Sequence, residues 1–391
     1  MESNVPREPV GSQFLNKQIT GAVSSLLESV GVSDAQELPL ALLFPTRPFS
    51  IPEIYLLVPG AFSGDTKEKL RDWACAFRGY APGEIPPDSE AGHNIVHHIP
   101  YARPRSGVRI AVTSWKTEVV SWRAAAMQRE DPDPDRYARL HQLLNGVLRA
   151  RERPDYVVLP ELSVPARWFL RLASKLSNRG ISLIAGIEYL HCSNVSNVEV
   201  ENKVWASLTC DLPGLRFVVC SQDKWQAAQE EEAKLWNTAG LRVRKLEKRI
   251  PKPIWHHGDF LFSILICSEL TNIDFRSELR GRIDALFVPE WNQDTETFSS
   301  LVESSALDIH AYIIQCNNRL YGDSRVRTPA KDSWKRDLIR VKGGEADYFV
   351  VGKLDVLNLR RFQSSYRSDK DGDFKPVPDG FEIDPARRLL P

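Results

Sequence analysis

The chain has 391 residues, of which 42% are hydrophobic, so it is long enough for one large domain with an extension or for two domains. Its 51 Lys and Arg residues balance 51 Asp and Glu residues, which argues against a basic nucleic-acid surface or attraction to an anionic membrane. No apolar run approaches the ~20 residues of a membrane span, and the first residues lack the apolar region of a signal peptide. We therefore expect a cytoplasmic protein without a membrane segment.

The first 107 residues differ in pattern from the rest. Apolar residues recur at helical spacing over Phe14–Val30, Ile54–Val58 has the pattern of a strand, and Asp65 can cap a helix that continues to Phe77. Residues 1–80 are thus expected to form a mainly helical N-terminal extension. Residues 81–107 carry five prolines and predict a linker, or an extended wrap over the domain that follows.

Strands and helices alternate from residue 108 onward. Val108–Trp115, Pro154–Glu161 and Ile181–Ile187 have buried-strand patterns, and the amphipathic segments Asp135–Arg151 and Trp168–Leu176 lie between them. This alternation is typical of a layered α/β domain. The further strands expected are 203–209, 215–220, 241–248, 260–267, 311–316 and 348–354, with a helix over 297–310. Residues 367–391 are polar and rich in Pro and Gly, which predicts a C-terminal tail on the surface.

Three chemically capable side chains follow strands of this domain. Cys267 ends the apolar run Phe260–Ile266, Glu161 directly follows another apolar strand, and Lys224 comes a few residues after a third. In α/β layers, side chains at such strand ends escape the packed sheet and gather where ligands bind. Taken singly, each has an ordinary explanation: a buried thiol, an acid at a helix start and a solvated lysine.

The order Glu, Lys, Cys in these surroundings resembles the nitrilase, or carbon–nitrogen hydrolase, superfamily. The matching segments are VVLPE (157–161), QDKW (222–225) and ILICSEL (264–270), supported by RIAVTSW (109–115), DALFVPEWN (284–292), SSALDIHAYIIQCNN (304–318) and GKLDVLNLRRF (352–362). The resemblance covers about residues 108–366 and departs from the usual pattern at Glu269, where Asp is commoner. It implies a nitrilase-like αββα sandwich.

The same resemblance implies a cysteine-dependent hydrolase of a non-peptide carbon–nitrogen bond, an amidase rather than a true nitrilase. Cys267 would be the nucleophile, Glu161 the general base, and Lys224 the cation that faces the oxyanion of an acyl-enzyme pathway. Glu231 would be a second glutamate beside the lysine, with Glu230 and Glu232 as alternatives, and Lys248 is an alternative to Lys224. A lysine cation and a helix N-terminus near the sulfur would favour its thiolate form.

The pocket residues expected on this basis are Glu269, Glu290, Trp291 and Asn292, which follow the cysteine or the next strand. The implied partners are a small amide or nitrile substrate and further copies of the chain in a homo-oligomer, without nucleic acid at the hydrolase domain. No cofactor is expected. His93, His97 and His98 lack a carboxylate or cysteine at matching spacing, and the six cysteines form no CxxC pair, so neither a metal site nor a disulfide framework is expected.

Three other interpretations of the sequence remain. A Cys–His pairing would need His257 close to Cys267, yet the two lie at opposite ends of one strand, roughly 30 Å apart at ~3.3 Å per residue. The domain could also be a non-catalytic or regulatory module that acts with a partner, as nitrilase-like domains do beside bacterial anti-phage reverse transcriptases. Acyl transfer to an acceptor other than water would use all the same site residues as hydrolysis.

Overall fold

The structure is a computed structural model that describes residues 96–101, 107–192, 198–212, 215–246, 249–365 and 372–389. The helical extension expected over residues 1–80, and most of the segment 81–107, lie outside these residues. The described residues from Val96 onward belong almost entirely to one α/β body.

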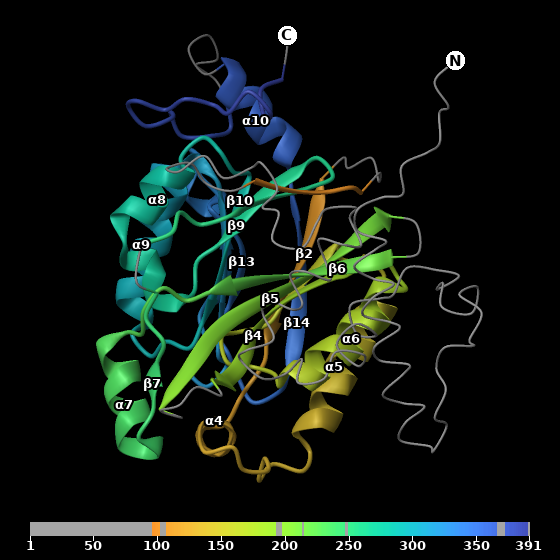
Figure 1. Ribbon diagram of the computed structural model, residues 1–391. Coiled ribbons are helices and arrows are strands. Elements are labelled where there is room, and N and C mark those ends of the chain that lie inside the picture. The colour runs from red at the N-terminus through yellow and green to blue at the C-terminus, as the bar shows by residue number, and fades with distance from the viewer. Residues whose placement is uncertain are drawn as a thin grey trace, which may run out of the picture. The chain divides into compact units, whose positions relative to one another are not determined.

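The strands form two sheets within this body (Figure 1). Sheet A has the order β1-β8-β9-β10-β11-β12-β13, with bounds Val96–Ile99, Ile254–His257, Phe260–Ile264, Ala285–Glu290, Tyr312–Asn317, Ser324–Arg327 and Asp337–Val341. Sheet B has the order β14-β2-β3-β4-β5-β6, with bounds Tyr348–Leu354, Val108–Ser114, Tyr156–Val158, Ser182–His191, Glu199–Leu212 and Leu215–Asp223. A short strand, β7 (Arg242–Val243), pairs with β5.

The helices lie outside the two sheets. The α-helices are α4 (Val119–Ala126), α5 (Arg136–Arg149), α6 (Ala166–Ser177), α7 (Gln229–Ala239), α8 (Ile273–Leu279), α9 (Thr295–Ser305) and α10 (Val356–Ser365). Short 3₁₀ segments cover Cys267–Thr271 (η3) and Ser333–Lys335 (η5), and a π-helical turn, η4 (Ala306–His310), continues α9.

Helix, sheet, sheet and helix form the four layers of the body. One core cluster packs α5 and α6 on the outer face of sheet B, and another packs α8 and α9 on the outer face of sheet A (Figure 1). The two sheets meet through aromatic rings, because Tyr156 of β3 lies 5.8 Å from Phe262 of β9 and 5.9 Å from Phe287 of β10, measured between ring centroids. The αββα sandwich expected from the sequence is therefore confirmed.

The central strands read as continuous apolar runs because both of their faces are covered. The residues of β3 and β10 are all buried, and both strands run parallel to their neighbours on each side. Parallel strands buried on two faces lose the alternation of polar and apolar residues that marks a half-exposed strand. Their carboxyl ends therefore present side chains at one edge of each sheet, which is where the candidate site residues lie.

Some elements differ from the sequence expectation. Residues 96–99, placed by the sequence in a linker or wrap, form β1 and pair in parallel with β8. Of the strand expected over 241–248, the described residues 241–246 form only the two-residue strand β7, and the strand β8 was not expected at all. Short edge strands such as β1 carry too few apolar residues to stand out in a segment rich in proline.

The C-terminal tail is anchored to the body by a buried ionic cluster. The guanidinium of Arg387 is fully buried and donates to Asp284 (3.0 Å), to the Gly281 carbonyl and to Gln363. Arg360 of α10 donates to the same Asp284 carboxylate (2.8 Å). Burial acts to raise the pKa of Asp284, but the two arginines outweigh it and hold that pKa below its usual value. The polar composition predicted a tail on the surface. It did not indicate the buried contact of Arg387, because the partner, Asp284, lies far away along the chain.

Arg387→Met is expected to lower the free energy of unfolding by about 3–5 kcal/mol, because it leaves buried acceptors without their donor. Urea unfolding followed by circular dichroism measures this difference. The matched control is Arg388→Met, at an exposed neighbouring position, which should change stability by about 0.5 kcal/mol or less. Equal stability of the two variants would show that the tail does not depend on the buried pair.

Candidate active site

Glu161, Lys224 and Cys267 each sit immediately beyond a strand. Glu161 lies in the turn after β3, Lys224 directly follows β6, and Cys267 begins η3 shortly after β9. Two of these turns are conformationally unusual, since Cys267 has φ of 48° and Leu162, next to Glu161, has φ of 51°. Positive φ is uncommon for residues with a side chain and is typically maintained at functional sites by the surrounding structure.

The turn that carries Glu161 packs directly on a glycine of the neighbouring strand. A Cβ atom at Gly186 of β4 would lie 2.4 Å from the Glu161 Cα atom and 2.5 Å from the Leu162 nitrogen. The Gly186 amide donates to the Pro160 carbonyl (3.0 Å), and the Gly186 carbonyl accepts from the Ser163 amide (2.9 Å). Only glycine allows this close approach, so it fixes the position of Glu161 at the end of β3.

One buried ammonium group joins two carboxylates. The Nζ atom of Lys224 lies 2.8 Å from Glu161 Oε1 and 2.5 Å from Glu231 Oε2, and both Lys224 and Glu161 are 2% exposed. Asn202 of β5 bridges the same pair, because its Nδ2 donates to Glu161 and to Glu231 at 2.8 Å each. The Tyr189 hydroxyl donates to Glu231 at 3.0 Å. Buried carboxylates require such donors, and this cluster supplies them.

Of the three consecutive glutamates in α7, Glu231 is the one that reaches this cluster. Glu230 and Glu232 are exposed, whereas the Glu231 carboxylate contacts Lys224, Asn202 and Tyr189. The α7 helix begins only a few residues after Lys224, so the first turn of the helix folds back toward the lysine. The alternative lysine, Lys248, lies outside the described residues.

Cys267 lies beside the same charges. The backbone N–H of Trp291 donates to Glu161 Oε2 (3.1 Å) and also acts to lower the pKa of the Cys267 thiol. Lys224 and Glu161 both act electrostatically on Cys267. Cys267 itself is 7% exposed. The structure thus brings Glu161, Lys224, Glu231 and Cys267 into one buried cluster.

Burial and charge set the protonation of these groups. Burial and the negative charge of Glu161 raise the pKa of the Cys267 thiol well above its usual value, and Lys224 only partly opposes them. The expected preference for the thiolate is therefore offset, because the lysine is already neutralised by two carboxylates. Burial acts to lower the pKa of Lys224, but Glu161 and Glu231 outweigh it and hold that pKa well above normal.

The two carboxylates of the cluster have opposite shifts. Burial raises the pKa of Glu161, even though Lys224 acts in the other direction. Burial also acts to raise the pKa of Glu231, but Lys224, Asn202 and Tyr189 outweigh it and leave that pKa below its usual value. When the pKa values of two neighbouring acids are pushed apart, the two acids commonly have different acid and base roles at the same site. Glu161 is the stronger base of the two, and Glu231 is the permanent partner of the lysine.

Glu269 connects two of the site turns, and its partner Lys252 was not foreseen. The Glu269 carboxylate accepts from the amides of Trp225 (2.7 Å) and Ile266 (2.9 Å), the neighbours of Lys224 and Cys267. It also lies 2.5 Å from Lys252 Nζ, and both side chains are 3% exposed. All of these contacts hold backbone segments, so we propose a positioning role for Glu269. Lys252 lies between two prolines before β8, and nothing in its local pattern distinguishes it from a surface lysine.

Glu290, Trp291 and Asn292 lie at the end of β10, next to the cluster. Glu290 is fully buried and accepts a hydrogen bond from Gln315 of β11 at 2.8 Å. The Asn292 amide donates to the side chain of Asn317 at 2.9 Å, and Asn317 Nδ2 donates back to the Asn292 carbonyl at 2.7 Å. The β10–β11 end thus holds the loop that supplies the Trp291 N–H.

His257, considered above as a partner of Cys267, has other hydrogen-bond partners. His257 hydrogen-bonds the Tyr156 hydroxyl through Nδ1 and the Thr209 carbonyl through Nε2, so both ring nitrogens are engaged between the sheets. Within the described ranges, no group of three or more His, Cys, Asp or Glu side chains could hold a metal ion. The helices described there also include none long and apolar enough to cross a membrane.

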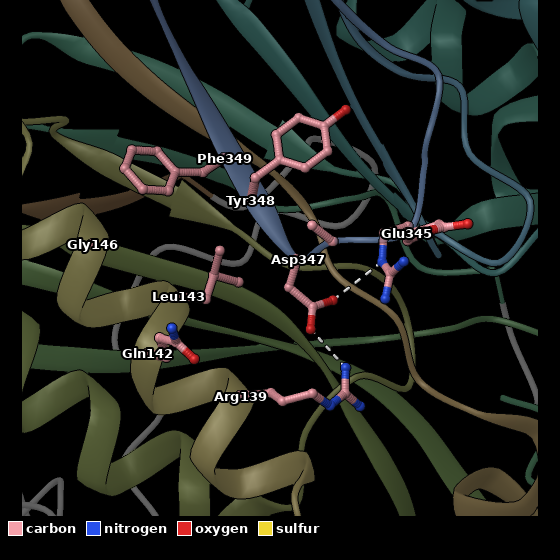
Figure 2. A pocket seen from close by; sticks show the side chains of 10 residues that line it. Arg139, Gln142, Leu143, Gly146, Glu345, Asp347, Tyr348 and Phe349 are labelled. Carbon is pink, nitrogen blue, oxygen red and sulfur yellow. Dashed lines mark hydrogen bonds and ion pairs between the residues drawn. The ribbon is translucent and has the colours of Figure 1, made fainter.

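A separate pocket of about 490 Å³ opens between α5 and the start of β14 (Figure 2). Figure 2 shows Arg139 beside the Asp347 carboxylate, at 2.6 Å. Arg319 lies 3.2 Å from the other oxygen of the same carboxylate. Both carboxylate oxygens are therefore occupied by side chains of the protein. None of the candidate site residues lines this pocket.

No protein-family model matches the chain, and no curated protein matches it at a significant level. Several solved structures do resemble it. Nit3 of Saccharomyces cerevisiae, a member of branch 10 of the nitrilase superfamily, has 16% identity and a TM-score of 0.47 over 68% of this chain and 96% of its own. A CN-hydrolase superfamily protein from Xanthomonas campestris has 14% identity and a TM-score of 0.47 over 70% of this chain and 99% of its own.

An amidase from Nesterenkonia sp. has 15% identity and a TM-score of 0.45, over 65% of this chain and 93% of its own length. These are the proteins to which the fold is similar.

Lys252→Met is expected to destabilise the protein by about 3–5 kcal/mol, because Glu269 would keep a buried charge without its cation. Urea unfolding gives the free energies of unfolding of the wild type, Lys252→Met, Glu269→Gln and the double variant, which form a double-mutant cycle. The double variant should lose less stability than the sum of the two single losses. Lys331→Met, at an exposed position, is the control for loss of a lysine charge. Additive losses would contradict direct coupling of the pair.

Proposed function

We propose that the protein is a cysteine hydrolase of a non-peptide carbon–nitrogen bond, with amides as its substrates. The observation that carries this proposal is the buried contact of Lys224 with both Glu161 and Glu231, next to Cys267. A buried ion cluster is costly and is a poor means of stabilising a fold, so its presence beside a strained, buried cysteine favours a chemical role.

In this proposal the first half of the reaction makes a thioester. The sulfur of Cys267 attacks the amide carbon while Glu161 accepts the thiol proton, so no free thiolate needs to be present beforehand. The raised pKa of Glu161 suits this step, because a stronger base takes the proton more readily. The ammonium of Lys224 faces the oxygen that becomes negative, and donors of this kind contribute ~3–4 kcal/mol each.

The second half releases the acyl group. Glu161 passes its proton to the nitrogen of the departing amine or ammonia as the carbon–nitrogen bond breaks, which leaves the acyl group on the sulfur of Cys267. Glu161 then accepts a proton from water as the water oxygen attacks the thioester. It returns that proton to the sulfur as the carbon–sulfur bond breaks, which releases the carboxylic acid and restores the thiol. Glu231 keeps Lys224 charged and in place throughout, and Asn202 fixes the distance between the two carboxylates.

Cys267→Ser is expected to abolish turnover while the fold survives, because the hydroxyl replaces the sulfur at nearly the same size but is a far weaker nucleophile at this site. Ammonia release from a panel of small primary amides and carbamoyl compounds measures turnover, and circular dichroism monitors the fold. Cys220→Ser, which removes a more exposed thiol on β6, should retain wild-type rates. Equal ammonia release by Cys267→Ser and the wild type would refute the proposal.

A further inference from the structure

Three glutamates, Glu161, Glu231 and Glu290, lie in or next to the cluster, and they differ in how many donors they receive. Glu231 accepts from Lys224, Asn202, Tyr189 and the Ala228 amide, and Glu161 accepts from Lys224, Asn202 and the Trp291 amide. Glu290 accepts from Gln315 alone, through Oε2. Its other oxygen, Oε1, has no hydrogen-bond partner among the described residues.

This difference in donors favours different charge states. A buried carboxylate is stable when several donors, preferably including a cation, replace the water that it has lost. Glu161 and Glu231 meet this condition through Lys224, whereas the fully buried Glu290 has only one neutral amide donor. The geometry is therefore that of a neutral carboxylic acid at position 290. In agreement, burial raises the pKa of Glu290 to about 8.

The charged groups around Glu290 come from several elements. Glu161, beyond β3, raises its pKa, and Cys267 of η3 is within electrostatic reach of Glu290. On the β12 side, Arg325 acts to lower the pKa of Glu290, but Arg325 is itself paired with Asp323, which acts in the opposite direction. No ion pair between Glu290 and a cation is present in the described part of the chain.

We propose that Glu290 is a positioning residue of the hydrolase, whose neutral carboxyl group keeps a further negative charge away from Cys267 and Glu161. This inference rests on the proposed function, because a further negative charge would oppose the formation of the thiolate and the oxyanion in that reaction. With Glu290 neutral, the cluster holds one ammonium and two carboxylates. With Glu290 ionised, a third carboxylate is added with no cation to balance it, and the loss of the Cys267 proton becomes less favourable.

The sign of the pH dependence follows from this arrangement. Below about pH 8 Glu290 is neutral, and the reactivity of Cys267 rises with pH in the usual way as its thiolate fraction grows. Above about pH 8 Glu290 ionises, raises the pKa of Cys267 further and suppresses that rise. A neighbouring charge that moves the pKa of a thiol by about one unit changes its thiolate fraction about tenfold.

The test measures the alkylation rate of Cys267 by 2-chloroacetamide from roughly pH 6 to roughly pH 10, on both sides of the Glu290 pKa. Peptide mapping separates the reaction of Cys267 from that of the other cysteines. The wild type should show a rise that breaks near pH 8. Glu290→Gln keeps the size and polarity of the side chain but cannot ionise, so its rate should continue to rise and exceed the wild-type rate about tenfold at the alkaline end. Glu303→Gln, a half-exposed glutamate of α9, should retain the wild-type break.

A second variant keeps the inference testable if Glu290→Gln does not fold. Gln315→Leu removes the one donor to the Glu290 carboxylate, so the break should move to higher pH. A break near pH 8 that persists in Glu290→Gln, or a wild-type profile with no break, would overturn the inference. Alkylation needs no turnover, so either result is independent of the proposed hydrolysis, which the ammonia-release assay tests. In the same way, a lack of ammonia release would not change the expected pH profile of Cys267.

Discussion

The candidate site depends on one ammonium group that serves two carboxylates away from water. Lys224 holds Glu161 and Glu231 at 2.8 and 2.5 Å, and neither the lysine nor Glu161 is more than 2% exposed. Removing the lysine would leave both carboxylates without their shared cation. The surrounding structure therefore has to fix all three positions at once, and much of the fold near the strand ends serves that purpose.

Separate parts of both sheets provide this support. Gly186 on β4 lets the Glu161 turn pack closely, and Asn202 on β5 bridges the two carboxylates. Glu269 ties the backbone before Cys267 to the backbone after Lys224, and its own charge is balanced by Lys252. From sheet A, the loop after β10 supplies the Trp291 N–H that donates to Glu161.

The protonation pattern fits a site in which the proton is moved at the moment of attack. Burial, together with Glu161, keeps Cys267 in the thiol form, and a base of raised pKa lies beside it. A permanently ionised cysteine would require an excess of positive charge. Here the single lysine is outnumbered by carboxylates, and the neutral state inferred for Glu290 limits that excess of negative charge.

The sequence could predict the layered α/β body because its buried strands are long apolar runs, and it could single out Glu161 and Cys267 because each ends such a run. It could not reveal Asn202 or Lys252, since a polar residue within a strand or between prolines gains meaning only from partners far along the chain. The same limit applies to Arg387, whose partner Asp284 is 103 residues away. Long-range pairing of buried charges leaves no local pattern.

The central claim is that the sulfur of Cys267 carries the acyl group during turnover. The most direct measurement is peptide mapping by mass spectrometry after the protein is mixed with small amides, nitriles and carbamoyl compounds and quenched in acid. The account predicts an added acyl or thioimidate mass on the peptide that contains Cys267, and on no other cysteine. Turnover that leaves the Cys267 peptide unmodified at every quench time, or an acyl mass on a different residue, would contradict it.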